Sequence, residues 1–544
     1  MTTCPISAIR PVSIPLSGEW CFSIDKDQVG EQQGWENPDF DDSSWATIGV
    51  PHTWNVMSEH SENEGLAWYR RSFTIPNESR DAYLRLRFEA VFYLARVWLN
   101  GQYLGQHEGG YTPFEFDVTS VIISGEKNVI AVQVDNLRAT NRIPVDITPD
   151  WSFDWWNYGG IRRDVSLEIT SQAYIARQQI VSVPHLSGID EADSVTVTAT
   201  ININNTSDSA LDATIQADLL DDANGQSVLT SSASTLVNVP ANNHAEVQIT
   251  VSLASPKLWH FDHPNLYRWS ASVRGTDGQV LHANEVTTGV RSVELKDGYL
   301  YVHGEPVRLV GVTRHADYPG QGSAETVTAM AADYEDSKIL NQVLSRPVHY
   351  PQHKFILDYA DRHGILLIPE VPAWQLTQEQ MYMEVFRSKP FVAGAIFWTY
   401  QDYRTRSEFI MGLVDFNRNR RGSWEILREQ YAPALIDSIR LSPTADEKLI
   451  ATIVLHTRGP GDADMPAYTL RAYTLHWVVI SADGSTEFSE GTIPLPTLSP
   501  ASQWSGKIQF TAPAEEYRIT MSIIRPTGYS VIERSYSGKG ELIP

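Results

Sequence analysis

Short segments that alternate apolar and polar residues dominate the first 290 residues of the chain. Residues 83–88 (YLRLRF), 95–99 (ARVWL) and 129–134 (VIAVQV) show this period of two, which is typical of half-buried β-strands. No helical periodicity interrupts these strands. The pattern predicts a jelly-roll sandwich of two antiparallel sheets over residues 1–171 and an immunoglobulin-like sandwich over residues 172–290.

The pattern changes at about residue 305, where predicted strands begin to alternate with predicted helices. Strands are expected at 307–312, 342–348, 365–368 and 392–398, and helices at 323–340 with Ser323 as N-cap, 354–363 ended by Gly364, 378–387 and 424–431. Such alternation indicates βαβ units around a parallel sheet. We therefore expect an incomplete (β/α) barrel of about four units over 291–436. A C-terminal β-sandwich over 437–544 completes a multidomain protein of the β plus α/β class.

Composition narrows the range of partners. The chain has 544 residues and a net charge of −24, which argues against nucleic acid or an anionic membrane as the main partner. No apolar run is long enough to span a bilayer, no secretory signal is visible, and the only cysteines are Cys4 and Cys21. We therefore expect a cytoplasmic protein. The 16 Trp and 23 Tyr residues suit sugar rings, which stack on flat apolar faces.

The four predicted strands of the α/β region all end in polar or aromatic residues. These ends are 314–317 (RHAD), 346–351 (RPVHYP), 370–374 (EVPAW) and 398–403 (WTYQDY). In parallel β/α barrels the functional groups lie at the carboxyl ends of the strands. The four ends together predict a polar pocket with aromatic walls.

Motifs in the expected order connect these strand ends with a known family. Residues 311–319 (GVTRHADYP) fit a Gly-Val-x-Arg-His-x-x-x-Pro signature, 349–351 (HYP) fit a Ser-His-Tyr-Pro strand end, and 154–164 (DWWNYGGIRRD) fit an N-terminal sugar-binding domain. The chain thereby resembles the β-galactosidase and β-glucuronidase group of family 2 glycoside hydrolases. The resemblance implies a sugar subsite lined by Asp154, His315, His349 and Trp398. The complete set of predicted substrate contacts is Asp154, Trp155, His315, Asp317, His349, Trp374, Trp398 and Tyr400.

The chain departs from this family where catalysis is expected. Enzymes of the family use two glutamates about 5 Å apart, one in an Asn-Glu pair on the fourth strand and one in a turn after the seventh. The α/β region spans only residues 305–436, whereas a complete barrel takes about 250 residues, and it contains no Asn-Glu pair. Both family glutamates are therefore missing. Glu370 and Asp402 are the best replacements, with Asp317 and Asp154 as reserves.

Three functions remain open. The first is a glycosidase that uses Glu370 and Asp402, the second a non-catalytic carbohydrate-binding homologue, and the third a structural or assembly protein. The many polar strand-end residues favour the first. For Glu370, however, an ion pair with Arg314 or Arg346 is as well supported by the sequence as a catalytic role.

Short sequence elements indicate which sugar is preferred and whether a cofactor is needed. Glucuronide-specific relatives carry an Asn-x-Lys element, whereas residues 412–422 contain no lysine, so a neutral β-galactoside is favoured unless Arg418, Arg420 or Arg421 replaces it. No metal-ligand spacing of Cys and His occurs, and no metal or cofactor is expected.

Four parallel strands cannot close into an ordinary barrel. We therefore expect a homo-oligomer in which a partner subunit covers the open barrel.

Overall fold

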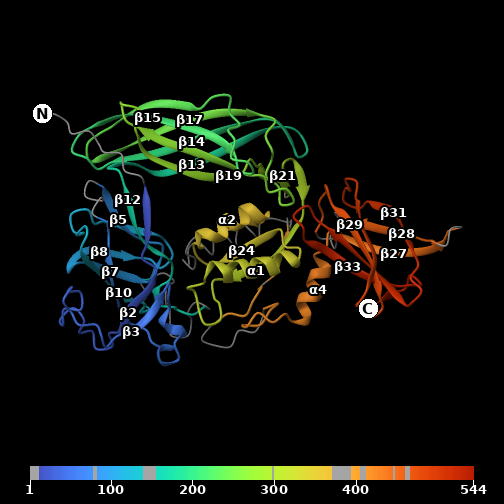
Figure 1. Ribbon diagram of the computed structural model, residues 1–544, viewed down its shortest axis with the longest axis horizontal. Helices are drawn as coiled ribbons and strands as arrows, with labels where there is room; N and C mark the ends of the chain where they lie inside the picture. Colours follow the sequence, from blue (N-terminus) through green and yellow to red (C-terminus); the bar gives the residue numbers. More distant parts are fainter. Residues whose placement is uncertain are drawn as a thin grey trace.

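Three β-sandwiches surround one small α/β unit (Figure 1). The computed structural model describes residues 11–76, 82–138, 142, 155–296, 299–370, 394–397, 399–404, 412–444, 448–459 and 466–543. In Figure 1 the α/β unit, in yellow, lies between the blue first sandwich and the orange-red C-terminal sandwich, and the green second sandwich extends above them. This architecture confirms the fold class expected from the sequence.

The first sandwich consists of two antiparallel sheets around an apolar core. One sheet has the order β1 (Val12–Pro15), β12 (Val165–Thr170), β5 (Tyr83–Phe88), β9 (Phe114–Asp117). The other has the order β3 (Ala46–Val50), β2 (Gly18–Ile24), β4 (Leu66–Thr74), β10 (Lys127–Asp135), β7 (Leu94–Leu99), β8 (Gln102–Glu108). A short pair, β6 (Val91–Phe92) and β11 (Gly160–Ile161), and two single 3-10 turns, Trp54–Val56 and Ser58–His60, lie beside them.

The second sandwich also follows its sequence pattern. Its sheets are β13 (Ala173–Gly188), β14 (Glu191–Asn205), β17 (Asn243–Ala254) and β16 (Ala233–Val239), β15 (Leu211–Asp221), β18 (Tyr267–Arg274), β19 (Val280–Thr288). Along β14 every second side chain from Val195 to Ile203 is fully buried, as a period of two requires. A small antiparallel sheet of β20 (Val293–Lys296), β21 (Tyr299–Val302) and β22 (Glu305–Val307) follows.

The described residues of the α/β unit form four parallel strands in an open sheet. Their order is β25 (Leu366–Leu367), β24 (Leu344–Val348), β23 (Leu309–His315), β26 (Gly394–Phe397). All seven residues of β23 are buried, as is typical of a parallel strand covered on both faces. Within the described residues β25 and β26 are the two outer strands, so the sheet is an incomplete barrel.

Within the described residues, three helices accompany the sheet: α1 (Val327–Ile339), α2 (Lys354–His363) and α4 (Gly422–Gln430). Helix α2 ends as predicted at Gly364, whose φ of 68° is left-handed and where a Cβ would lie 2.1 Å from the Phe261 carbonyl oxygen. The predicted N-cap of α1 was wrong, because the Thr326 hydroxyl, and not Ser323, accepts the hydrogen bond from Ala329 N. The helix expected at 378–387 lies outside the described residues.

The C-terminal sandwich fixes the orientation of the α/β unit. Its sheets are β27 (Ala434–Pro443), β28 (Lys448–Thr457), β31 (Gln503–Thr511) and β30 (Glu487–Pro494), β29 (Thr474–Ser481), β32 (Tyr517–Ile524), β33 (Ser530–Ser537), β34 (Leu542–Ile543). Leu309 and Leu344, at the amino ends of β23 and β24, belong to the same apolar core as this sandwich. The carboxyl ends of these strands therefore point away from it.

Those carboxyl ends contact the first sandwich. The Tyr111 and Tyr350 rings stack with centroids 4.3 Å apart, and the Arg163 guanidinium donates hydrogen bonds to the carbonyl oxygens of Tyr111 and Pro351. The edge of the sheet that carries the candidate residues is thus covered by the jelly roll. Over the described ranges, no helix is both long enough and apolar enough to cross a membrane.

Candidate active site at the strand ends

Two histidines at neighbouring strand ends form the centre of the candidate site. His315 is the last residue of β23 and His349 directly follows β24, so parallel pairing places them together. Their ring centroids are 5.2 Å apart with an interplanar angle of 69°. The side chains are 1% and 7% exposed. Burial, with the like charge of His349 as a smaller cause, holds the pKa of His315 well below its usual value.

Aromatic rings from outside these two strands pack on the histidines. Trp155, from the first sandwich, stacks on His349 with centroids 5.2 Å apart. Tyr403, which follows β26 in the chain, stacks on His315 with centroids 3.8 Å apart. Trp155 was predicted as a substrate contact, whereas Tyr403 was not singled out. Its aromatic character and its place after the fourth strand were the only available signals.

Glu370 joins this group through both of its carboxylate oxygens. Oε2 lies 3.0 Å from Nδ1 of His349 and Oε1 lies 2.5 Å from Nε of Arg346. The ion pair with Arg346, one of two partners considered from the sequence, is therefore present. The other, Arg314, instead pairs with Glu325 and Asp333 beneath the strand ends, at 2.6 and 2.8 Å.

Asp402 belongs to a different set of contacts. Arg421 binds both of its carboxylate oxygens, at 2.8 and 2.5 Å, and the backbone N–H of Gly412 donates a further hydrogen bond to Oδ1. Asp402 is 8% exposed. The carboxylate thus joins the chain after β26 to the segment that leads into α4.

Asp317 is a buried carboxyl group held by neutral donors. Oδ1 accepts a hydrogen bond from the Tyr158 hydroxyl at 2.9 Å, and Oδ2 accepts one from the backbone N–H of Arg404 at 2.7 Å. Burial raises its pKa to about 6, because an uncompensated charge is costly away from water. Close to neutral pH this carboxyl is therefore partly protonated.

Of the remaining predicted contacts, the structure describes only Tyr400, which is not part of this group. Tyr400 is 1% exposed and its hydroxyl donates a hydrogen bond to Asp336 of helix α1, so its ring belongs to the core of the α/β unit. Asp154, Trp374 and Trp398 lie outside the described residues. Among the described residues, no cluster of three or more His, Cys, Asp or Glu side chains could hold a metal ion.

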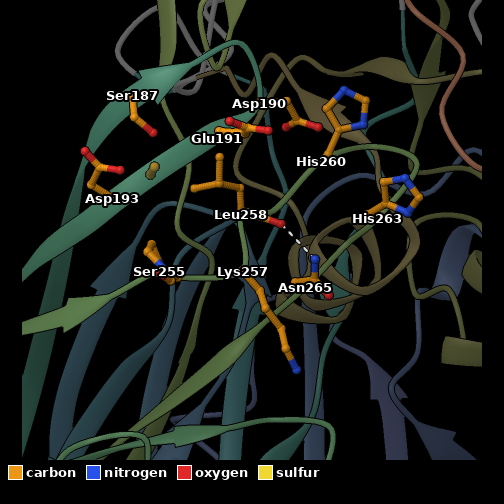
Figure 2. A pocket seen from close by; sticks show the side chains of 12 residues that line it. Ser187, Asp190, Glu191, Asp193, Ser255, Lys257, Leu258, His260, His263 and Asn265 are labelled. Atoms are coloured by element: carbon orange, nitrogen blue, oxygen red, sulfur yellow. Dashed lines mark hydrogen bonds between the residues drawn. The ribbon is translucent and has the colours of Figure 1, made fainter. Parts of the chain in front are cut away.

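A separate cavity of about 450 Å³ lies beside the second sandwich. In Figure 2 the carboxylate of Asp190 comes from the turn between β13 and β14, those of Glu191 and Asp193 come from the start of β14, and Lys257 extends away from them. Lys257 pairs with Asp221 at 2.7 Å and Asp190 with Arg471 at 3.7 Å. The first pair lies within the second sandwich and the second pair joins it to the C-terminal sandwich. None of the strand-end residues lines this cavity.

The combination of sandwiches, a barrel-like parallel sheet and an aromatic, acidic strand-end site is that of a multidomain glycoside hydrolase. Three family models match successive parts of the chain: the sugar binding domain of glycosyl hydrolases family 2 at residues 14–171, a further domain of that family at 178–291 and its TIM barrel domain at 293–390. The chain belongs to glycosyl hydrolase family 2.

Individual relatives carry two different activity names. The chain is 33% identical over 347 residues to a β-galactosidase of Thermoanaerobacter pseudethanolicus, and 32% identical over 372 residues to a putative β-glucuronidase of Formosa agariphila. These alignments cover 62% and 66% of this chain but only 44% and 43% of the relatives. The chain thus spans less than half the length of these curated relatives.

Solved structures show the same fold. A β-glucuronidase of Bacteroides uniformis matches with a TM-score of 0.68 and 16% identity, over 97% of this chain and 80% of that one. A β-glucuronidase of Bifidobacterium dentium, solved with coumarin-3-O-glucuronide, matches with a TM-score of 0.66 and 19% identity, over 78% of this chain and 98% of that one. At these identities the likeness concerns the fold alone.

Proposed function

We propose that this protein hydrolyses terminal β-glycosides, with β-galactosides as its preferred substrates. The observation that carries the proposal is the convergence of His315, His349, Glu370 and Trp155 at the carboxyl ends of β23–β25. A carboxylate beside two imidazoles and an indole face combines hydrogen-bonding groups with a stacking surface. Sugar recognition and glycosidic bond cleavage require both.

Glu370 is the carboxylate proposed to act on the glycosidic bond, and His349 orients it through the Nδ1 contact. Hydrolysis needs a second carboxyl group and opposite protonation states for the two. Asp402 is the second member predicted from the sequence, although its bidentate pairing with Arg421 restrains it. Asp317, with its pKa raised to about 6 by burial, is the alternative acid.

A neutral sugar is favoured over a uronic acid. Each arginine that could replace the missing lysine already holds a carboxylate of the chain: Arg418 pairs with Asp333, Arg420 with Asp336 and Arg421 with Asp402. A uronate would have to compete with these ion pairs. A galactoside needs only hydrogen bonds and stacking.

Sugar binding without hydrolysis is the second candidate function. The specific observation in its favour is that an arginine pairs with each predicted catalytic carboxylate, Arg346 with Glu370 and Arg421 with Asp402. Carboxylates fixed in this way still accept hydrogen bonds from sugar hydroxyls. Under this alternative, the protein binds β-galactosides at the strand ends and releases them unchanged.

We also propose a homo-oligomer, because the open sheet leaves β25 and β26 as outer strands within the described part of the chain. Unpaired strand edges favour association. Static light scattering that gives a mass of one 61.0 kDa chain at all concentrations would exclude this assembly.

Assays with three nitrophenyl glycosides separate the two candidate functions. The β-galactoside, β-glucoside and β-glucuronide are offered to the wild type, and lactose binding is measured in parallel by calorimetry. Turnover that is fastest for the galactoside supports the first candidate. Lactose binding that Trp155→Ala weakens, without turnover above an enzyme-free blank, supports the second candidate. If neither turnover nor lactose binding is observed, both candidate functions are refuted.

A further inference from the structure

One lysine is completely buried where the α/β unit meets the C-terminal sandwich. Lys338 of helix α1 is 0% exposed, and its Nζ lies 5.6 Å from the centre of the Tyr529 ring, which belongs to the C-terminal sandwich. Within the described residues it forms no ion pair, and its hydrogen bond to the Gly364 carbonyl oxygen is 3.5 Å long. Lysine side chains are almost never completely buried unless they are paired. Lys338 is an exception, and the proposed hydrolysis does not use it.

A buried arginine beside this lysine lacks hydrogen-bond acceptors. Arg525, which directly follows β32 in the C-terminal sandwich, is 1% exposed, and its Nη2 donates a hydrogen bond to the Tyr468 hydroxyl at 2.9 Å. Its Nε and Nη1 make no hydrogen bond to any part of the chain that the structure describes. Oδ1 of Asp262, from the loop between β17 and β18, is 3.9 Å from Nη1, which is too long for a hydrogen bond. Because buried donors without an acceptor are costly, these two groups favour an additional anionic acceptor.

The surroundings of Lys338 favour a neutral amine. Burial and the like charge of Arg525 lower the pKa of Lys338 to about 7. The negative charges of Asp262 and Glu335 act in the opposite direction, but neither carboxylate forms an ion pair with Lys338 within the described ranges. Glu335 instead accepts hydrogen bonds from two tyrosine hydroxyls, and burial raises the pKa of Asp262. A lysine that is desolvated and lies beside another cation is a nucleophile.

A cavity of about 540 Å³ lies beside this junction, and residues of the second sandwich, helix α2 and the C-terminal sandwich line it. Arg362, one of its charged groups, already pairs with Asp222 at 2.7 Å. Lys338 does not line the cavity, so a reagent that reaches its Nζ from there must be small and uncharged. The titratable groups of the lining are Asp262, His263, Arg362, His363 and Tyr529.

We propose that Lys338 is a modification site at which CO₂ reversibly forms a carbamate. The Nζ atom forms a bond to the carbon of CO₂, one carbon–oxygen π bond opens to give a carboxylate, and Nζ loses one proton. Asp262, which lines the cavity, is the carboxylate that takes this proton and passes it to water. The carbamate oxygens accept hydrogen bonds from Nε and Nη1 of Arg525, and the modification thereby ties helix α1 to the C-terminal sandwich. This proposal does not depend on hydrolysis at the strand ends.

Carbon-13 NMR of the full chain in ¹³C-bicarbonate at pH 8 tests the proposal. Bicarbonate supplies dissolved CO₂, and ¹⁵N labelling of the lysines splits the signal of a carbon bonded to Nζ, which excludes the α-amino group. The wild type should give one dominant split carbamate signal. With a pKa of about 7, the neutral fraction of Lys338 exceeds that of an exposed lysine, whose pKa is about 10.4, by more than about a hundredfold. The signal should disappear when bicarbonate is removed.

Three variants assign the signal. Lys338→Met should abolish it, whereas Lys354→Met, at a lysine whose side chain is 78% exposed, is the matched control and should keep it. Arg525→Met, which removes the donors to the carbamate, should weaken it by about tenfold. Bicarbonate should raise the melting temperature of the wild type, relative to sodium chloride of equal ionic strength, but not that of Lys338→Met.

The absence of a split carbamate signal from the folded wild type overturns the proposal, and this result does not require any variant to fold. A signal that persists in Lys338→Met also overturns it, because the modified lysine is then another one.

Discussion

The Glu370 carboxylate lies 3.0 Å from Nδ1 of His349 and connects two strand ends of the open sheet. Its other oxygen contacts Arg346, which belongs to β24, one strand away from Glu370's own. The three side chains therefore form one unit whose geometry depends on the parallel pairing of β24 and β25. This unit supports both local stability and the proposed chemistry.

The pairing of Arg346 with Glu370 should be measurable as a coupling free energy. Because the Arg346 side chain is 38% exposed, solvent screens the pair, and we expect a coupling of about 1 kcal/mol in the free energy of unfolding. A double-mutant cycle with Arg346→Met and Glu370→Gln, followed by urea denaturation, measures it. The exposed pair Lys354–Asp358 serves as the comparison and should give about 0.3–0.5 kcal/mol. Equal coupling free energies for the two pairs would show that Arg346 stabilises Glu370 no more than an ordinary surface ion pair would.

Asp317 should make the protein less stable as the pH rises from about 4 to 6. Its pKa is about 6 in the folded state and about 3.9 when unfolded, so the folded state binds more protons between these values. The free energy of unfolding should therefore fall by up to about 3 kcal/mol across this window. Asp317→Asn should remove most of this slope, whereas the surface variant Asp358→Asn should keep it. A slope that survives in Asp317→Asn would contradict the assignment.

Lys338, in contrast, should make the protein more stable as the pH rises above 7. It is fully buried, and Asp262, Glu335, Arg525 and the Tyr529 ring surround it. Burial lowers its pKa to about 7, so the unfolded chain binds more protons between pH 7 and about 10.4. Stability contributed by this residue should rise across that range.

Denaturant titrations at pH 7, 8 and 9 measure this effect as the difference between wild type and Lys338→Met. The wild type should gain stability relative to the variant as the pH rises. Lys354→Met, at an exposed lysine, is the matched control. Its free energy of unfolding should change with pH as that of the wild type does. If Lys338→Met also runs parallel, Lys338 is charged in the folded protein at all three pH values.

Removal of Arg314 should be strongly destabilising. Its guanidinium and the two carboxylates of Glu325 and Asp333 are all at most 3% exposed in their side chains. In Arg314→Met the buried carboxylates of Glu325 and Asp333 lose this partner, while Arg418 still pairs with Asp333. We expect the free energy of unfolding to fall by about 3–5 kcal/mol. Addition of Glu325→Gln should restore part of this loss in urea denaturation. No recovery would indicate that packing, and not charge, determines the effect.

The sequence predicted those parts of the fold that depend on local patterns. The apolar run that begins β23, the alternation in β14 and the glycine after α2 each reflect a preference of neighbouring residues. The small sheet of β20–β22 was missed, because its three short strands fall where residues 291–307 had been assigned to the barrel. The cap of α1 was misplaced because Ser323 and Thr326 are both good N-cap residues.

The site was predictable as a set of strand ends, but its internal contacts were not. Parallel pairing alone brings His315 and His349 together, so their positions in the chain were sufficient. The stacking of Tyr403 on His315 and the pairing of Arg421 with Asp402 depend on the path of the chain after β26. No local pattern encodes these contacts.

Turnover by Glu370→Gln tests the central claim most directly. The kcat/KM of wild type and variant is measured on nitrophenyl β-galactoside, whose leaving group needs no protonation, and on lactose, whose leaving group does. If Glu370 acts on the glycosidic bond, the variant should lose about 10²–10⁴-fold on lactose, and on both substrates if it is the nucleophile. Glu246→Gln, on the exposed side of β17, should lose nothing. Equal turnover of both substrates by wild type and Glu370→Gln would contradict the claim.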